Sequence, residues 1–248
     1  MKRRYLLIAS LSAICFRLTA QPLSDNNGEK VQSANPVGTL TVTVTVPPND
    51  NRIVVVCTAS SASADPPTVT LNGTTITQSH FAKNASGRTG AMYYMVLPNT
   101  GAEISAEIIA TGTSLRLLGA SSFHNVNTTT PVNGAASNIF TMGNTPTNLT
   151  VVSASNDLVC DCLAAFAPSP STDIIADATQ TVVLKDTTGT QLFGISTRPG
   201  ADFVNMLWSV QGNFSGGNAI HLGLNLVAGS VLPVELTFFK GKSTPQGH

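Results

Sequence analysis

Cysteine and histidine are the residue types in this 248-residue sequence best suited to nucleophilic or metal chemistry, with four of each. Beyond residue 20 the cysteines are Cys57, Cys160 and Cys162, and the last two form a Cys-Asp-Cys run. Structural zinc sites typically use Cys pairs separated by two to four residues, with further Cys or His ligands. No histidine lies near the Cys-Asp-Cys run, so the sequence predicts neither a metal site nor a cofactor.

A disulfide is the second chemistry to consider for these cysteines. In a strand, Cys160 and Cys162 would share one face about 6.6 Å apart, whereas a disulfide needs Cβ atoms about 3.8 Å apart. The two therefore do not pair with each other. Cys57 is a candidate partner for either of them if the strands are neighbours. The alternative, three small apolar residues in a core, is favoured.

The histidines His80, His124, His221 and His248 stand outside any nucleophile motif, since the sequence has no Gly-x-Ser-x-Gly and no His-Glu-x-x-His. The run 219–226 alternates, and it places His221 and Asn225 opposite its leucines, so His221 is predicted to be solvated.

Acidic residues are few and most lie in predicted turns. Asp161, inside the Cys-Asp-Cys strand, is expected to face outward, and Glu103 and Glu107 to lie at an exposed strand face. A glycosidase would need two positioned carboxylates, and the sequence shows no such pair. It therefore predicts no catalytic residues and a protein that is not an enzyme.

Aromatic rings for stacking on sugars are also few, with one Trp and three Tyr. Trp208 shares its strand face with apolar neighbours and is predicted to lie in the core. Tyr93 and Tyr94 point to opposite faces of one strand, so one of them is a candidate ligand-binding residue at an exposed rim. A groove lined by Asn, Thr and backbone groups is the other candidate for ligand binding.

The composition excludes some classes of partner and indicates a compartment. Only 10 % of residues are charged and the net charge is zero, which argues against nucleic acid. Lys2, Arg3 and Arg4 precede a short apolar run, and Leu18-Thr19-Ala20 is an acceptable cleavage site. Residues 1–20 are therefore predicted to be a signal peptide, and the mature chain is predicted to be exported and to have no membrane span.

The rest of the chain has the pattern of an all-β protein. Residues 40–46 alternate apolar residues with Thr, as a half-buried strand does. Residues 51–58 (NRIVVVCT) form a continuous β-branched run typical of a strand covered on both faces. Asn72-Gly73 between β-forming residues predicts a type I′ hairpin that pairs Val69 with Ile76. About ten strands are expected, in an antiparallel β-sandwich. The runs "NDNRIVVVCTAS" and "SASNDLVCDCLAA" are alike, which is attributed to similar environments rather than to an internal repeat.

Several segments together carry a resemblance to a known family. They are "NDNRIVVVCTAS", "PTVTLNGTTITQ", "GAMYYMVLPNTGAEISAEI", "GASSFHNVNTTTPVN" and "SNDLVCDCLAA". In this order they resemble uncharacterised secreted bacterial domains with a jelly-roll-like β-sandwich. The family often has Trp where this chain has Tyr93 or Tyr94, and apolar residues at Cys160 and Cys162. The resemblance brings no catalytic residues with it.

The segment "LPVELTFFKGK" near the end of the chain resembles the start of the C-terminal sorting region of Bacteroidota proteins exported by the type IX system. The resemblance implies a surface or secreted location and, with a complete sorting region, the secretion machinery as a partner. The expected organisation is a signal peptide (1–20), a linker (21–36), a β-sandwich (37–230) and a truncated sorting stub (231–248). The expected function is a non-catalytic structural or adhesive module that binds an extracellular glycan or protein. A carbohydrate-binding module is the alternative, and a hydrolase comes third.

Overall fold

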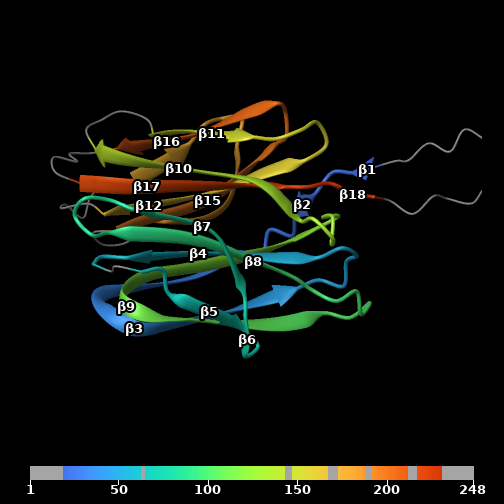
Figure 1. The fold of residues 1–248 in the computed structure, drawn as a ribbon, viewed down its shortest axis with the longest axis horizontal. Helices are drawn as coiled ribbons and strands as arrows, with labels where there is room; N and C mark the ends of the chain where they lie inside the picture. Colours follow the sequence, from blue (N-terminus) through green and yellow to red (C-terminus); the bar gives the residue numbers. More distant parts are fainter. Residues whose placement is uncertain are drawn as a thin grey trace, which may run out of the picture.

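The computed structural model of the chain describes residues 19–62, 65–142, 147–166, 173–187, 191–211 and 217–230. These residues form strands β1 to β18 and no helix, and the strand pairings are antiparallel. The predicted all-β class is therefore confirmed. Figure 1 shows two stacked groups of strands, one from the blue-to-green first part of the chain and one from the yellow-to-red second part.

The first group, here called the first half, is one sheet that curls over on itself. Its order is β6-β5-β9-β4-β8-β7, with β2 and β3 also paired to β9. The long strands β3 and β9 run through both layers of the curl. The bounds are β2 Leu23–Ser24, β3 Glu29–Val46, β4 Ile53–Ser60, β5 Thr68–Leu71, β6 Thr74–Thr75, β7 Thr77–Lys83, β8 Thr89–Val96 and β9 Ile104–His124.

The second half divides its strands between two sheets. Five strands have the order β10-β17-β12-β15-β14, and three have the order β11-β16-β13. The short strands β1 (Thr19–Ala20) and β18 (Gly229–Ser230) pair with each other at one end of the molecule. The other bounds are β10 Val132–Met142, β11 Thr147–Val152, β12 Leu158–Phe166, β13 Asp173–Ala176, β14 Thr181–Asp186, β15 Gln191–Pro199, β16 Phe203–Gln211 and β17 Gly217–Leu226.

The two halves have the same strand order. In the first half, β4 lies between β8 and the C-terminal part of β9, and β12 lies between β15 and β17 in the second half. The N-terminal part of β9 pairs with β5 and with the end of β3, as β16 pairs with β13 and β11. Thus β3 corresponds to β10 and β11 together, and β9 to β16 and β17 together.

Local details repeat along with the topology. Asn51 and Asn156 precede the equivalent strands β4 and β12, and both have positive φ, 53° and 75°. The register of β7 on β8 shifts between Gln78 and His80, and that of β14 on β15 shifts between Val182 and Leu184. The likeness of the two sequence runs therefore belongs to a structural repeat, and attributing it only to similar environments was wrong. Each run forms the doubly covered strand of its own half.

Apolar side chains fill three layers between the sheets. One cluster lies between the halves and joins Cys57 and Met92 to Cys160 and Phe193. A second lies inside the curl of the first half, and two smaller clusters lie between the sheets of the second half. Every residue of β4 and β12 is buried, as expected for strands covered on both faces.

The Asn72–Gly73 hairpin and its register are confirmed. Both residues have positive φ, 47° and 80°, and the Ile76 amide donates to the Val69 carbonyl at 3.0 Å. Gly73 has open space around it, so its place in the turn reflects the left-handed backbone rather than a close approach.

Residues 21–36 were predicted to be a linker, and this is corrected by the pairing of 29–32 with β9. Their polar side chains suit a partly exposed edge of the sheet, and the Asn-Gly and Asn-Pro pairs had favoured a linker over a strand.

Within the predicted signal peptide, Thr19 and Ala20 pair with β18, so cleavage after Ala20 would remove that pairing. Residues 1–18 and 231–248, with the predicted sorting stub, lie outside the described residues. No helix in the described residues is long and apolar enough to span a membrane.

Candidate functional site

A buried hydrogen-bond network occupies the core of the second half. Its centre is Asp161 on β12, whose Oδ1 accepts from the backbone N of Ser196 (2.9 Å) and from its Oγ (2.6 Å). The other oxygen, Oδ2, accepts from Trp208 Nε1 (2.8 Å) and His221 Nε2 (2.8 Å). All four side chains are fully buried. The predictions that Asp161 faces outward and that His221 is solvated were both wrong.

The network extends by two further side chains. Gln180 Nε2 donates to Ser196 Oγ at 2.6 Å, and Gln180 Oε1 accepts from the Leu207 amide. On the other side, His221 Nδ1 lies 3.4 Å from Thr147 Oγ1. Hydroxyl, imidazole and carboxylate thus follow one another in the order of a catalytic triad, although the Thr147 hydroxyl also donates to the Trp208 carbonyl at 3.3 Å. However, Thr147 is 1 % exposed and His221 0 %, so a substrate does not reach them in this conformation.

Comparison of the halves shows that this network replaces an apolar core. The pairing registers match each member of the network with one residue of the first half. All of those residues belong to the cluster inside the curl of the first half. In the order Thr147, Asp161, Gln180, Ser196, Trp208 and His221, they are Val42, Val56, Ile76, Tyr93, Ile108 and Leu118.

Trp208, predicted to be a core residue, is fully buried. Its ring lies against Gly194, where an added Cβ would be 2.5 Å from Cη2. Alanine at this position therefore forces the ring out of place, and Gly194→Ala is expected to destabilise the protein by about 1–3 kcal/mol. Trp208 is the single tryptophan, so its fluorescence during denaturant unfolding measures the loss of stability. Its emission spectrum in the folded state reports any change in the environment of the ring.

Gly38→Ala is the matched control for this prediction, because the nearest atom to its added Cβ is 3.8 Å away. The control is expected to keep the parental stability and emission spectrum. A Gly194→Ala protein with unchanged unfolding midpoint and unchanged emission would contradict tight packing of Trp208 on Gly194.

The three cysteines Cys57, Cys160 and Cys162 are free and buried, in line with the favoured prediction of core residues. Cys57 of the first half faces Cys162 of the second across the interface between the halves. Burial, and next the hydrogen bond with Cys162, raises the pKa of the Cys57 thiol well above its ordinary value. Burial and then the Asp161 charge raise the pKa of Cys160. These thiols are poor nucleophiles in the folded protein.

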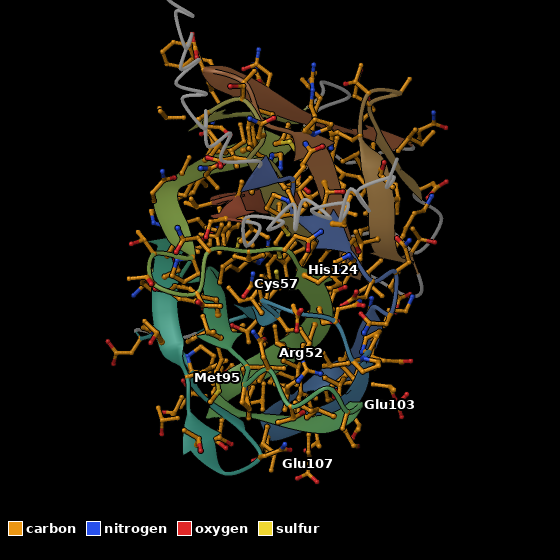
Figure 2. The ribbon with its side chains drawn as sticks, turned by 90° about the vertical axis from the view of Figure 1, so that its right-hand side faces the viewer. Arg52, Cys57, Met95, Glu103, Glu107 and His124 are labelled. Carbon is orange, nitrogen blue, oxygen red and sulfur yellow. The ribbon has the colours of Figure 1, made fainter. Side chains whose placement is uncertain are left out.

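The two tyrosines proposed for ligand binding differ in their exposure to solvent. Tyr93 is 2 % exposed, donates its hydroxyl to the Pro67 carbonyl at 2.5 Å, and has its pKa raised by burial. Tyr94 is partly buried and packs against the cluster between the halves. Tyr93 therefore offers no stacking face, which corrects its candidacy, and only part of Tyr94 is accessible. Glu103 and Glu107 are exposed as expected, whereas Arg52 and Cys57 lie within the body of the protein (Figure 2).

A second polar cluster surrounds Asp25, which directly follows β2. Its Oδ1 accepts from Asn49 Nδ2 (3.0 Å) and lies 2.7 Å from His124 Nδ1, and its Oδ2 accepts from the Ser122 hydroxyl. The Asp25 side chain is 1 % exposed and that of His124 is 20 % exposed. Ser122 is directed at the carboxylate rather than at the imidazole, so His124 is not placed to deprotonate it. The cluster fixes residues 24–27 against β9.

An open polar groove of about 790 Å³ lies at the end of the molecule where β4 begins and β18 ends. Its wall includes a reciprocal pair of amides, in which the Asn51 backbone donates to Asn99 Oδ1 (2.8 Å) and Asn99 Nδ2 donates to Asn51 Oδ1 (3.3 Å). Asp50 is the one ionisable side chain among the described residues of the lining. The other lining residues are Ala20, Asn125, Val126, Asn127, Thr128, Thr129, Thr130, Gly229 and Ser230.

The groove agrees with the sequence-based expectation of a site made of Asn, Thr and backbone groups, but the sequence did not locate it. Its residues come from five separated segments, which pairing of the strands brings together. They are the loop residues 50–51, 99 and 125–130 and the strands β1 and β18. Among the described residues, no group of three or more His, Cys, Asp or Glu side chains is placed to hold a metal ion.

The fold and these sites define an all-β protein of two topologically equivalent halves. No protein-family model and no curated protein matches the sequence. Among solved structures, the chain is similar to a tryptophan-to-tyrosine variant of oxalate decarboxylase from Bacillus subtilis, with 7 % identity and a TM-score of 0.21 over 88 % of this chain and 80 % of that one. A likeness at this level carries no argument about activity.

Proposed function

We propose that this chain is a non-catalytic binding module of a secreted or cell-surface bacterial protein, with a structural or adhesive role. The observation that carries the proposal is the contrast between the two kinds of polar site. The carboxylate–imidazole network around Asp161 is buried and saturated with hydrogen bonds, whereas the open groove presents neutral amides and hydroxyls and a single carboxylate, that of Asp50. Neutral hydrogen-bonding groups recognise ligands without providing an acid or a base, and no imidazole or second carboxylate accompanies Asp50 among the described residues of the lining.

The apolar run behind Lys2, Arg3 and Arg4 supports an exported location, and the Leu232–Thr237 segment supports export by a type IX system in Bacteroidota. The Thr-rich outer face of β3 is typical of a strand that faces solvent. An extracellular glycan or protein is the proposed class of partner.

Carbohydrate binding in the groove is the second candidate, favoured by the Asn and Thr lining. Hydroxyls and amides bind sugar hydroxyls by hydrogen bonds, each contributing about 0.5–1.5 kcal/mol. The test is binding of the purified protein to a panel of neutral glycans. Replacement of Asp50 and Thr128 by alanine is expected to weaken a groove-bound glycan roughly tenfold or more.

Thr43→Ala, on the exposed face of β3, is the matched control and is expected to bind as the parent does. Trp208 emission confirms that each variant is folded. Equal binding by the groove variant and the parent would place the glycan elsewhere. Absence of binding across the panel, from folded protein, would leave a structural or protein-adhesive role as the function to test.

A further inference from the structure

Two arginines meet at the other end of the interface between the halves, about eight residues of β4 away from the groove. Ser60, the last residue of β4, pairs with Thr89 on β8 and with Leu115 on β9. Arg88 precedes Thr89 and Arg116 follows Leu115, so the two arginines flank the end of β4. At about 3.4 Å per residue, β4 separates them from the groove by roughly 25 Å.

Both arginines reach across to the second half. The Arg88 guanidinium carbon lies 5.1 Å from the centre of the Phe166 ring. The Arg116 Nε and Nη2 donate to the side-chain oxygen of Gln191, with the Gln191 amide oriented to face them. Phe166 and Gln191 are directly paired on β12 and β15. Since paired residues have Cα atoms about 5 Å apart, the two cationic groups converge over neighbouring positions.

The positive charges at this place lack an acidic partner in the described residues. The ion pairs of that part of the chain use Lys30, Lys185, His124 and His221 as cations, and neither arginine. The adjoining segments 167–172 and 188–190 contain no Asp or Glu, and the loop that follows β4 contains one, Asp65. Gln191 supplies a neutral acceptor only. Burial, and next the positive charge of Arg88, lowers the pKa of Arg116.

Arg88 also keeps an unused donor inside the protein. Its Nη1 is buried and has no hydrogen-bond partner among the described residues. An unpaired buried donor of a charged group is costly. Arg88 and Arg116 as whole residues are nevertheless partly exposed, so an anion can approach the pair from solvent. Arginine forks are suited to carboxylate and sulfate oxygens, which they bind by paired N–H donors.

We propose that Arg88 and Arg116 form a binding site for an oxyanion, a carboxylate or sulfate group, at the interface between the halves. Such groups occur free in solution and as substituents of acidic polysaccharides. The site does not depend on the groove, because the two lie at opposite ends of β4.

The test compares the parent with Arg88→Gln, Arg116→Gln and the double variant, using sulfate against chloride at equal ionic strength. Sulfate at tenfold above its Kd is expected to raise the Tm of the parent by about 3–6 °C. The double variant is expected to lose this shift. Lys83→Gln removes one exposed positive charge from the same half and is expected to keep it.

Dextran sulfate, carboxymethyl dextran and neutral dextran then distinguish the source of the anion. Binding of the two charged polymers, weakened tenfold or more in the double variant and unchanged in Lys83→Gln, assigns the site to anionic polysaccharide. A Tm shift with sulfate alone and no polymer binding assigns it to a free oxyanion. The proposal is overturned by no response to any of these probes, by an equal response in the double variant, or by an equal loss in Lys83→Gln. The groove variant with Asp50 and Thr128 replaced is expected to bind the anions normally. Failure of the glycan test in the groove and failure of the anion test at the arginines can therefore be told apart.

Discussion

Replacement of Asp161 by alanine is expected to lower the free energy of unfolding by about 3–5 kcal/mol, since it breaks a buried charged network. The change leaves Trp208 Nε1, His221 Nε2 and the Ser196 amide without their acceptor in a core that excludes water. Asp161→Asn is also expected to destabilise, because donors face both carboxylate oxygens and an amide nitrogen would oppose one of them. Denaturant unfolding followed by Trp208 fluorescence and circular dichroism measures the loss.

Val56→Ala is the matched control, because Val56 holds the equivalent position in the apolar core of the first half. Truncation of Val56 removes only apolar packing and is expected to lower the free energy of unfolding by about 2 kcal/mol. The double variant Asp161→Val with His221→Leu is expected to lose less than the sum of its single changes, since the two side chains bind each other. A loss for Asp161→Ala no greater than that for Val56→Ala would show that the network adds nothing beyond packing.

Arg52→Met is expected to cost about 3–5 kcal/mol of stability as well. The side chain is fully buried. Its Nη1 donates to the carbonyls of Pro47 (2.9 Å) and Ala102 (2.8 Å). Its Nη2 donates to the Pro98 carbonyl and to Thr100 Oγ1 (3.2 Å). Methionine fills the space but removes all four hydrogen bonds. The three carbonyls keep only weaker local partners, the Asn49 amide and the Thr100 amide and hydroxyl. The loops before β4 and between β8 and β9 therefore lose their common anchor.

Arg198→Met is the control of identical chemistry, because Arg198 is partly exposed and donates from Nη1 to the Asn205 carbonyl at 2.8 Å. Its loss is expected to stay below about 1 kcal/mol. Arg52→Lys keeps the charge without the fork and is expected to fall between the parent and Arg52→Met. Hydrogen exchange of the Leu97 amide, which donates to the Arg52 carbonyl at 2.9 Å, reports local loosening. Equal stability of Arg52→Met and Arg198→Met would contradict the anchoring role.

The sequence predicted the fold class because its strongest signals are local. Alternation in 40–46, the continuous run in 51–58 and the Asn72–Gly73 turn each depend on neighbouring residues. The structure has a strand at each of the two runs, with β4 beginning at Ile53, and it has the predicted turn. The prediction of about ten strands was too low. The structure also has a single long strand, β9, because strand pairing continues on both sides of the irregularity at Ser114, which has a positive φ of 56°.

The network around Asp161 was missed because alternation separates the two faces of a strand without showing what covers them. His221 and Asn225 do lie opposite the leucines of β17, as predicted, but the three-stranded sheet covers that face. Polar residues on such a strand look solvated until the second layer is known. The usable signal was the combination of Asp161 inside a continuous apolar run with Trp208 and His221 on other strands, since an acid within a doubly covered strand needs donors.

The repeated strand order also has a consequence for how the protein reaches its native state. Apart from the β1–β18 pair and the Val126–Ala228 bridge, strand pairing in the described residues stays within each half, and side chains join one half to the other. Chain segments of this kind can each complete their pairing before they associate. We therefore expect association of the halves to be a late step in folding. Until it occurs, Cys57, Cys160 and Cys162 are expected to be open to solvent, because they lie on the faces that meet in the native structure. The rate at which these thiols become protected from a thiol-reactive reagent during refolding therefore measures the rate of association of the halves.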